Sequence, residues 1–133
     1  MDKYTISFNI NKHQWLTSNG RYHYMDKARR TKQLRRRAFY EARAKNYHAH
    51  LDKPVFTEPV EVVAAIGYPT AGKADPPNAA PTVKALLDGL TDAELWPDDD
   101  SKHVARTSYE RGPDTRMAGI HRVTLTITRK ETN

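Results

Sequence analysis

The pattern of hydrophobic and polar positions predicts four strands. From Tyr4 to Ile10, Tyr, Ile and Phe alternate with Thr, Ser and Asn, which is typical of a strand with one buried face. The second segment is apolar almost throughout, which indicates a mostly buried strand. The last segment alternates again and directs Val123, Leu125 and Ile127 inward. The predicted strands cover 4–10, 60–68, 103–109 and 120–128.

Two segments between these strands repeat their apolar residues at helical spacing. The first has Asp26 as a possible cap and runs to about Lys45. Its narrow apolar stripe consists of Ala28, Leu34, Ala38 and Ala42, with Phe39 beside it. The second helix spans Thr82 to Leu90, and its apolar face consists of Val83, Leu86, Leu87 and Leu90.

The predicted order of elements is β-α-β-α-β-β, which implies an α/β fold with helices packed on a mixed sheet. A chain of 133 residues suits one domain with one modest core, so we expect a single domain over 1–133. Segment 69–81 is rich in Pro, Gly and Ala and is expected to form an irregular loop.

Composition narrows the function classes. The chain has no Cys, which excludes a disulfide scaffold, a thiolate zinc site and a Cys nucleophile. We find no signal peptide and no apolar run long enough to span a membrane, so we expect a cytoplasmic protein with no membrane partner. The formal net charge is +6 and the pI is about 9.6, which fits either a polyanionic partner or a basic surface without one.

The placement of the positive charge favours the polyanionic partner. The first predicted helix holds nine of the 22 Lys and Arg residues but only two acidic residues, Asp26 and Glu41. A helix face that merely contacts water would usually mix positive and negative side chains. The excess of positive side chains on this helix therefore favours a surface that contacts phosphates. Tyr22, Tyr24 and Tyr40 lie nearby and can either stack on splayed bases or cover the edge of the sheet. The cations of this helix expected to contact DNA are Arg29, Arg30, Lys32, Arg35, Arg36 and Arg37.

Two acidic loops suggest a catalytic site inside this basic chain. Asp75 follows the second strand, and Asp98, Asp99 and Asp100 precede the third. If these strands are neighbours, the two loops are expected to converge at one end of the sheet. Paired carboxylates are suited to Mg²⁺ or Mn²⁺, and Lys84 on the helix between the loops would place a cation beside a reacting phosphate. An ordinary acidic turn at 98–100 is the competing interpretation.

These residues resemble the RusA family of Holliday-junction resolvases. The resemblance rests on Ala74–Asn78, on Pro81–Leu90 and on Leu95–Asp100, with Trp15–Arg21 before a basic helix as a further match. It covers nearly the whole chain, and its specific part is 75–100. Pro77 stands where the family usually has a second Asp, which leaves one carboxylate fewer. Asn78, Asp98 or Asp100 would have to supply the missing oxygen.

The resemblance implies a homodimeric, Mg²⁺- or Mn²⁺-dependent endonuclease that makes paired nicks in branched DNA such as four-way junctions. Asp75, Lys84 and Asp99 match its catalytic positions, and the metal ligands would be Asp75, Asp99, Asp98 and Asp100. Two matched cuts fit a symmetric pair of identical sites. No small-molecule substrate is expected. Further DNA contacts are assigned to Asn19, Arg21 and Arg106.

Two other function classes remain open at this point. A protein that keeps this fold and binds branched DNA without cutting it would explain Pro77. A basic structural protein of an RNA particle would need neither acidic loop. His48, His50 and His103 are interpreted as surface or strand residues, although His103 lies close enough in sequence to the acidic turn to support it or to contact a phosphate.

Overall fold

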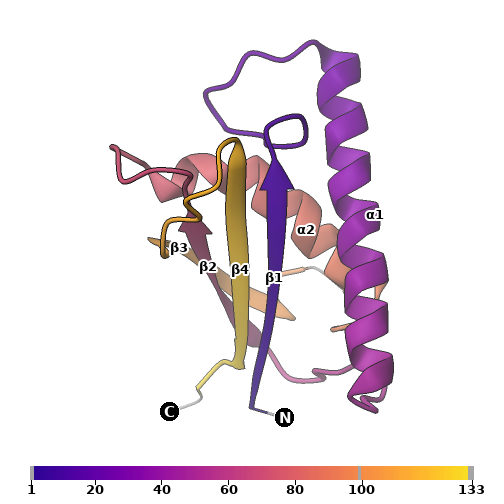
Figure 1. Cartoon of the computed structure of the whole chain (residues 1–133). Coiled ribbons are helices and arrows are strands. Elements are labelled where there is room, and N and C mark those ends of the chain that lie inside the picture. Colours follow the sequence, from indigo (N-terminus) through magenta and orange to yellow (C-terminus); the bar gives the residue numbers. More distant parts are fainter. Residues whose placement is uncertain (1, 99, 132–133) are drawn as a thin grey trace.

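A computed structural model describes residues 2–98 and 100–131 and contains four strands and two α-helices (Figure 1). The strands are β1 (Lys3–Asn11), β2 (Val60–Gly67), β3 (Val104–Arg111) and β4 (Ile120–Arg129). The helices are α1 (Tyr24–His48) and α2 (Ala80–Asp92), and a short 3-10 helix, η1 (Pro76–Ala79), precedes α2. The predicted α/β class and the predicted order of strands and α-helices are confirmed.

The strands form one mixed sheet in the order β1-β4-β2-β3. β4 is antiparallel to both of its neighbours, whereas β2 and β3 are parallel and connected through α2. In the parallel pair, Val60 lies beside Val104 at one end and Ile66 beside Arg111 at the other. A loop that follows β2 and a turn that precedes β3 therefore lie at opposite ends of the sheet.

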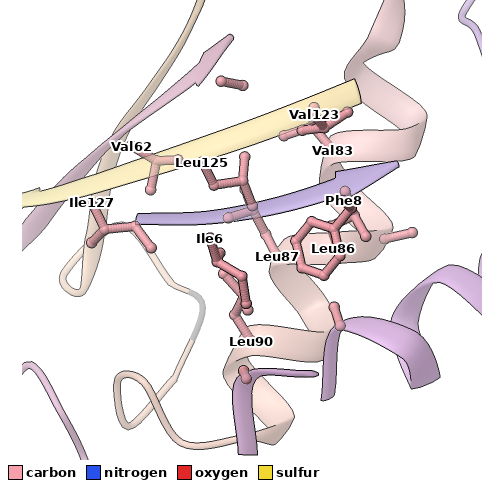
Figure 2. Packing of buried hydrophobic residues seen from close by; sticks show 14 of the residues in the cluster. Ile6, Phe8, Val62, Val83, Leu86, Leu87, Leu90, Val123, Leu125 and Ile127 are labelled. Atoms are coloured by element: carbon pink, nitrogen blue, oxygen red, sulfur yellow. The ribbon is translucent and has the colours of Figure 1, made fainter. Parts of the chain in front are cut away.

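The hydrophobic core lies between one face of the sheet and the two helices. Figure 2 shows side chains of β1, β2 and β4, such as Phe8, Val62 and Leu125, directed towards Leu86 and Leu90 of α2. The helix α1 contributes Leu34, Ala38, Ala42 and Asn46, a stripe with a period of four residues that continues the predicted one. Small residues in this stripe let α1 approach α2 closely, and Gly89 of α2 lies against the backbone of Arg35 and Phe39.

The ends of both helices differ from the expected ones. His23, not Asp26, caps α1, because its side chain accepts a hydrogen bond from the backbone N–H of Met25. Asp26 instead binds two arginines of the same helix. Ala28 was assigned to the buried stripe but is exposed. Part of the irregular loop expected at 69–81 is helical, since η1 leads directly into α2.

Within the described residues, no helix combines the length and the apolar character needed to cross a membrane.

Candidate active site

A polar pocket of about 230 Å³ lies where the loop after β2 meets the loop after β1. The loop after β2 contributes Asp75 and Lys73, and the loop after β1 contributes Asn19. The pocket thus joins two of the sequence stretches that carry the resemblance. Its lining residues are Trp15, Thr17, Asn19, Tyr68, Lys73, Ala74, Asp75, Asn78, Ala79 and His121.

Backbone hydrogen bonds hold the two loops together. The N–H of Ser18 donates to the carbonyl of Asn78 over 2.9 Å. The buried hydroxyl of Thr82, in the first turn of α2, accepts from the N–H of Leu16 at 2.9 Å and donates to the carbonyl of Leu16 at 2.8 Å. These bonds fix Asn19 and Asn78 on the same pocket although 59 positions separate them in the sequence.

Three rings form one wall of the pocket, which we call the aromatic wall: Trp15, His121 and Tyr68. The indole of Trp15 stacks on the imidazole of His121 with ring centres 4.1 Å apart and an angle of 10° between the planes. Tyr68 meets the same imidazole edge-on at 5.5 Å. Burial lowers the pKa of His121, so the ring is neutral at neutral pH. Its Nδ1 atom is buried without a hydrogen-bond partner.

Two further residues that line the pocket carry charge. Asp75 and Lys73 are both exposed. Burial raises the pKa of Tyr68. The charge of Arg111 lowers this pKa and the charge of Asp75 raises it, so the Asp75 carboxylate lies close enough to Tyr68 to act on it electrostatically. Arg111 also holds the loop, because it donates to the carbonyls of Gly72 and Thr70 at 2.7 and 3.0 Å.

The donor set is compatible with a hard divalent cation only if water and a bound phosphate supply the remaining ligands. Asp75 supplies carboxylate oxygens, and the side-chain amides of Asn19 and Asn78 can supply neutral ones. Mg²⁺ is usually held by one or two carboxylates together with water and substrate phosphates, so a full cage is not required. Over the part of the chain that the structure describes, no three His, Cys, Asp or Glu residues come together as a metal site.

Of the acidic turn, Asp98 and Asp100 do not line this pocket, so for these described residues the expected convergence of the two loops is wrong. The loop after β2 lies beside the end of β3, since Thr115 N–H donates to the carbonyl of Tyr68 at 2.8 Å. Asp100 lies at the start of β3, where its carbonyl accepts from Val104 N–H at 2.9 Å. Between these ends β2 runs for six residue steps, about 20 Å at roughly 3.3 Å per residue.

The described part of the acidic turn is used locally. The Asp100 carboxylate contacts Nδ1 of His103 at 2.7 Å and accepts from the N–H of Lys102 at 3.1 Å. The hydrogen bond with His103 is the main cause of a lowered pKa of Asp100. Asp98 is exposed, and Asp99, the predicted catalytic acid of the turn, lies outside the described residues.

Lys84 is placed on the exposed side of α2 and does not line the pocket. Its Nζ donates to Asp88 one turn further along the helix, at 2.7 Å.

Several of the cations assigned to DNA on α1 have partners within the protein. Asp26 accepts from Arg29 at 2.5 Å and from Arg30 at 2.8 Å. Arg30 also donates to the carbonyls of Lys12 and Trp15 and lies over the ring of Tyr22, so it holds the loop beside the pocket.

Further along α1, Arg35 forms a bidentate pair with Asp92 of α2, at 2.6 and 2.9 Å. Arg37 donates to Glu41 at 2.7 Å and to the carbonyl of Asn9. Among the described residues, Lys32 and Arg36 form no ion pair and are exposed.

Two more predicted DNA contacts lie apart from α1. Arg21 is exposed in the loop before the helix and does not line the pocket. Arg106 pairs in register with Glu61 and lies on the face of the sheet opposite the helices. Arg106 therefore does not belong to the surface that α1 forms.

Sequence reasoning identified Asn19, Asp75 and Asn78 but missed the aromatic wall. Trp15 was part of the resemblance without a role of its own. His121 has no local signal, because a single His in a strand is not distinguishable from any other polar strand residue. The register of β1 and β4, which pairs His121 with Ile10 at the end of β1, would have been needed to find it.

No known protein-family model and no curated protein matches the chain.

Proposed function

We propose that this protein is a metal-dependent endonuclease that hydrolyses phosphodiester bonds in branched DNA, such as four-way junctions, in recombination and repair. The observation that supports it best is the meeting of Asn19, Asp75 and Asn78 in one polar pocket. These residues come from the two sequence stretches that resemble the nuclease family, and nothing in their spacing along the chain requires them to be neighbours.

In this proposal, Asp75 would hold the cation, and the amides of Asn19 and Asn78 would bind water or the phosphate. The chemistry that Mg²⁺ or Mn²⁺ would supply there is polarisation of the phosphate and activation of a water molecule as the nucleophile. Lys73 lines the same pocket and can interact with the negative charge that develops on the phosphate. Lys84 supports a phosphate only if it leaves Asp88, so we give Lys73 the closer role.

The basic face of α1 supplies the contacts to the DNA arms. Lys32 and Arg36 offer exposed charges, and exposed Tyr24 and Tyr40 lie on the same helix. Arg30 anchors the loop that bears Asn19, so the DNA surface and the pocket are connected through one segment of the chain. As a homodimer, the protein would present two such pockets to two strands of a junction.

The test is cleavage of a labelled four-way junction with Mg²⁺ or Mn²⁺ by wild type and Asp75→Asn. The variant is expected to lose nicking entirely while it binds the junction as tightly as wild type or more tightly, because it lacks one negative charge near the phosphate. Asp52→Asn is the matched control, since Asp52 is an exposed carboxylate beyond the end of α1. Nicking by Asp75→Asn at the wild-type rate would remove the pocket from catalysis.

A second candidate function is binding of branched DNA without cleavage. It is favoured by one observation: Asp75 is the single acidic residue among the described residues that line the pocket, and Pro77 occupies the position of a further acid. Under this function, wild type and Asp75→Asn would both bind the junction, and neither would nick it at any concentration of Mg²⁺ or Mn²⁺.

A further inference from the structure

We propose that the pocket beside Asp75 accepts one unstacked nucleotide of the DNA, with its base against the aromatic wall. This inference deepens the proposed function and rests on it for the identity of the ligand. It concerns which DNA the site selects, and it assigns a role to Trp15 and His121.

The arrangement of rings is the first reason. Trp15 and His121 are stacked at 4.1 Å, and Tyr68 contacts the imidazole edge-on, so the rings form a rigid wall rather than separate side chains. Base–aromatic stacking is the common way in which proteins hold an unpaired base, and it tolerates any base because every base has a π face. The wall lines the same pocket as the carboxylate of Asp75.

The polar groups of the pocket are the second reason. Asn19 and Asn78 each offer an amide donor and acceptor, which match the edges of bases, and Thr17 adds a hydroxyl. Lys73 offers a cation for the phosphate. The volume of about 230 Å³ is below the roughly 300–1,000 Å³ of sites that enclose a drug-sized ligand, so it suits a single base.

The imidazole of His121 is the third reason. Its Nδ1 is buried without a hydrogen-bond partner, which leaves Nε2 as the ring nitrogen that a group in the pocket can reach. A ring that served only to fill the core would be better replaced by an apolar side chain, because a buried nitrogen without a partner is unfavourable. A neutral imidazole with one accessible nitrogen can instead form a hydrogen bond with a polar group of the nucleotide beside the wall, in addition to the stacking that the rings provide.

Such a pocket would give the nuclease its preference for branched DNA. A base inside a duplex arm must first be unstacked and unpaired, which costs free energy, whereas a base at a branch point is already partly free. The pocket would therefore bring a phosphate to Asp75 only where the adjoining base can leave the stack.

The experiment uses four-way junctions that carry 2-aminopurine, whose fluorescence reports base stacking, either at a branch-point position or in the middle of an arm. Wild-type protein is added in metal-free buffer, so no strand is cut. Binding is expected to change the emission at one or more branch-point positions and to leave the mid-arm positions unchanged. Unchanged emission at every branch-point position, with the junction bound, would overturn the proposal.

Variants of His121 test whether the aromatic wall contacts the DNA or only stabilises the fold. His121→Phe keeps a ring on Trp15 and should retain the emission change, whereas His121→Leu should lose it and bind the junction roughly 5- to 150-fold more weakly, as expected for one lost base stack. Binding of a fully paired duplex, together with the melting temperature, controls for misfolding. Equal junction affinity of His121→Leu and wild type would contradict the proposed role of His121.

The outcomes distinguish this inference from the proposed function. A junction that is nicked without any emission change keeps the nuclease and removes the base pocket. An emission change without nicking under any metal condition keeps the base pocket and removes the nuclease.

Discussion

His121 is enclosed by Trp15 and Tyr68, and this surrounding makes the neutral form of its imidazole the favoured one. The pKa of His121 is therefore lower in the folded protein than the usual 6.5, and the unfolded chain takes up a proton first as the pH falls. The contribution of His121 to stability is fully present above that usual value and is lost as the pH falls through it towards the folded pKa.

The prediction is that wild type loses more free energy of unfolding than His121→Phe when the pH is lowered from about 7 to about 5. Phenylalanine keeps the stack on Trp15 but cannot be protonated. Urea denaturation at a series of pH values measures this difference, and the other histidines cancel because both proteins share them. Parallel pH profiles would mean that the imidazole is protonated as easily in the fold as in the unfolded chain.

Single residues show what sequence reasoning can suggest and what it cannot reveal. Asp75 and Asn78 could be chosen because a loop after a buried strand is a usual place for functional groups and because the neighbouring residues resemble a family. Arg30 was chosen for its charge alone, yet it is largely occupied by Asp26 and by two backbone carbonyls. Its partners depend on how the loop 12–22 folds over α1, which charge patterns do not reveal.

At the scale of elements, the contact between α1 and α2 depends on Gly89. A Cβ atom at this position would collide with the carbonyl oxygen of Arg35 and would lie 2.7 Å from Cβ of Ala38 and 3.0 Å from the backbone nitrogen of Phe39. Two of these neighbours are backbone atoms and cannot rotate away. The two helices would have to separate to make room.

We expect Gly89→Ala to destabilise the protein by about 1–3 kcal/mol, although Ala favours an isolated helix by about 1 kcal/mol over Gly. Chemical denaturation measures the loss. Gly72→Ala is the control, because a Cβ there would meet only the Thr70 hydroxyl at 3.8 Å and should change stability by less than about 0.5 kcal/mol. A Gly89→Ala protein as stable as wild type would show that the helices are not in close contact.

The helix α1 also allows the DNA surface to be tested residue by residue. Lys32 and Arg36 are exposed without ion pairs among the described residues, whereas Arg30 is tied to the fold. Each phosphate contact that is lost reduces the slope of log binding constant against log salt by about 0.9. Lys32→Gln with Arg36→Gln should therefore reduce the slope for junction binding by up to about 2 and leave the melting temperature nearly unchanged.

Arg30→Gln is the matched variant and should show the reverse: a lower melting temperature with little direct change in the slope. Salt titrations of junction binding by wild type, the double variant and Arg30→Gln measure these slopes. An unchanged slope in the double variant would place the DNA on another surface of the protein.

The elements themselves were largely predictable, and their arrangement was not. Alternating and continuous apolar runs predicted β1, β2 and β4 within a few residues of their ends, since burial of one or both faces leaves a direct trace in the sequence. The bounds predicted for β3 were also close, although none of its residues is fully buried. The strand order β1-β4-β2-β3 leaves no such trace. The prediction that the two acidic loops converge failed for this reason, because it assumed the relative positions of the ends of β2 and β3.

For the whole molecule, the parallel pairing of β2 and β3 has a direct consequence for catalysis. The pocket with Asp75 lies at one end of this pair, and Asp100, from the turn that also bears Asp99, lies at the other. If the acidic turn takes part in cleavage, as the family resemblance implies, the position of Asp100 leads us to expect that the turn contributes to the pocket of a second chain. A two-fold dimer would then contain two sites, each built from both chains.

The last prediction tests this arrangement by mixing two inactive variants, Asp75→Asn and Asp99→Asn, under conditions that allow chains to exchange. If each site takes Asp75 from one chain and Asp99 from the other, a mixed dimer has one site with both carboxylates and one with neither. Mixing should then restore nicking in about half of the dimers, with one strand cut per junction. If both carboxylates of a site come from one chain, every site in the mixed dimer lacks one of them and no nicking returns. Sedimentation of the mixture confirms that dimers are present, and each variant incubated alone gives the background. If a mixture that contains mixed dimers shows no nicking, the acidic turn acts within its own chain or has no part in cleavage.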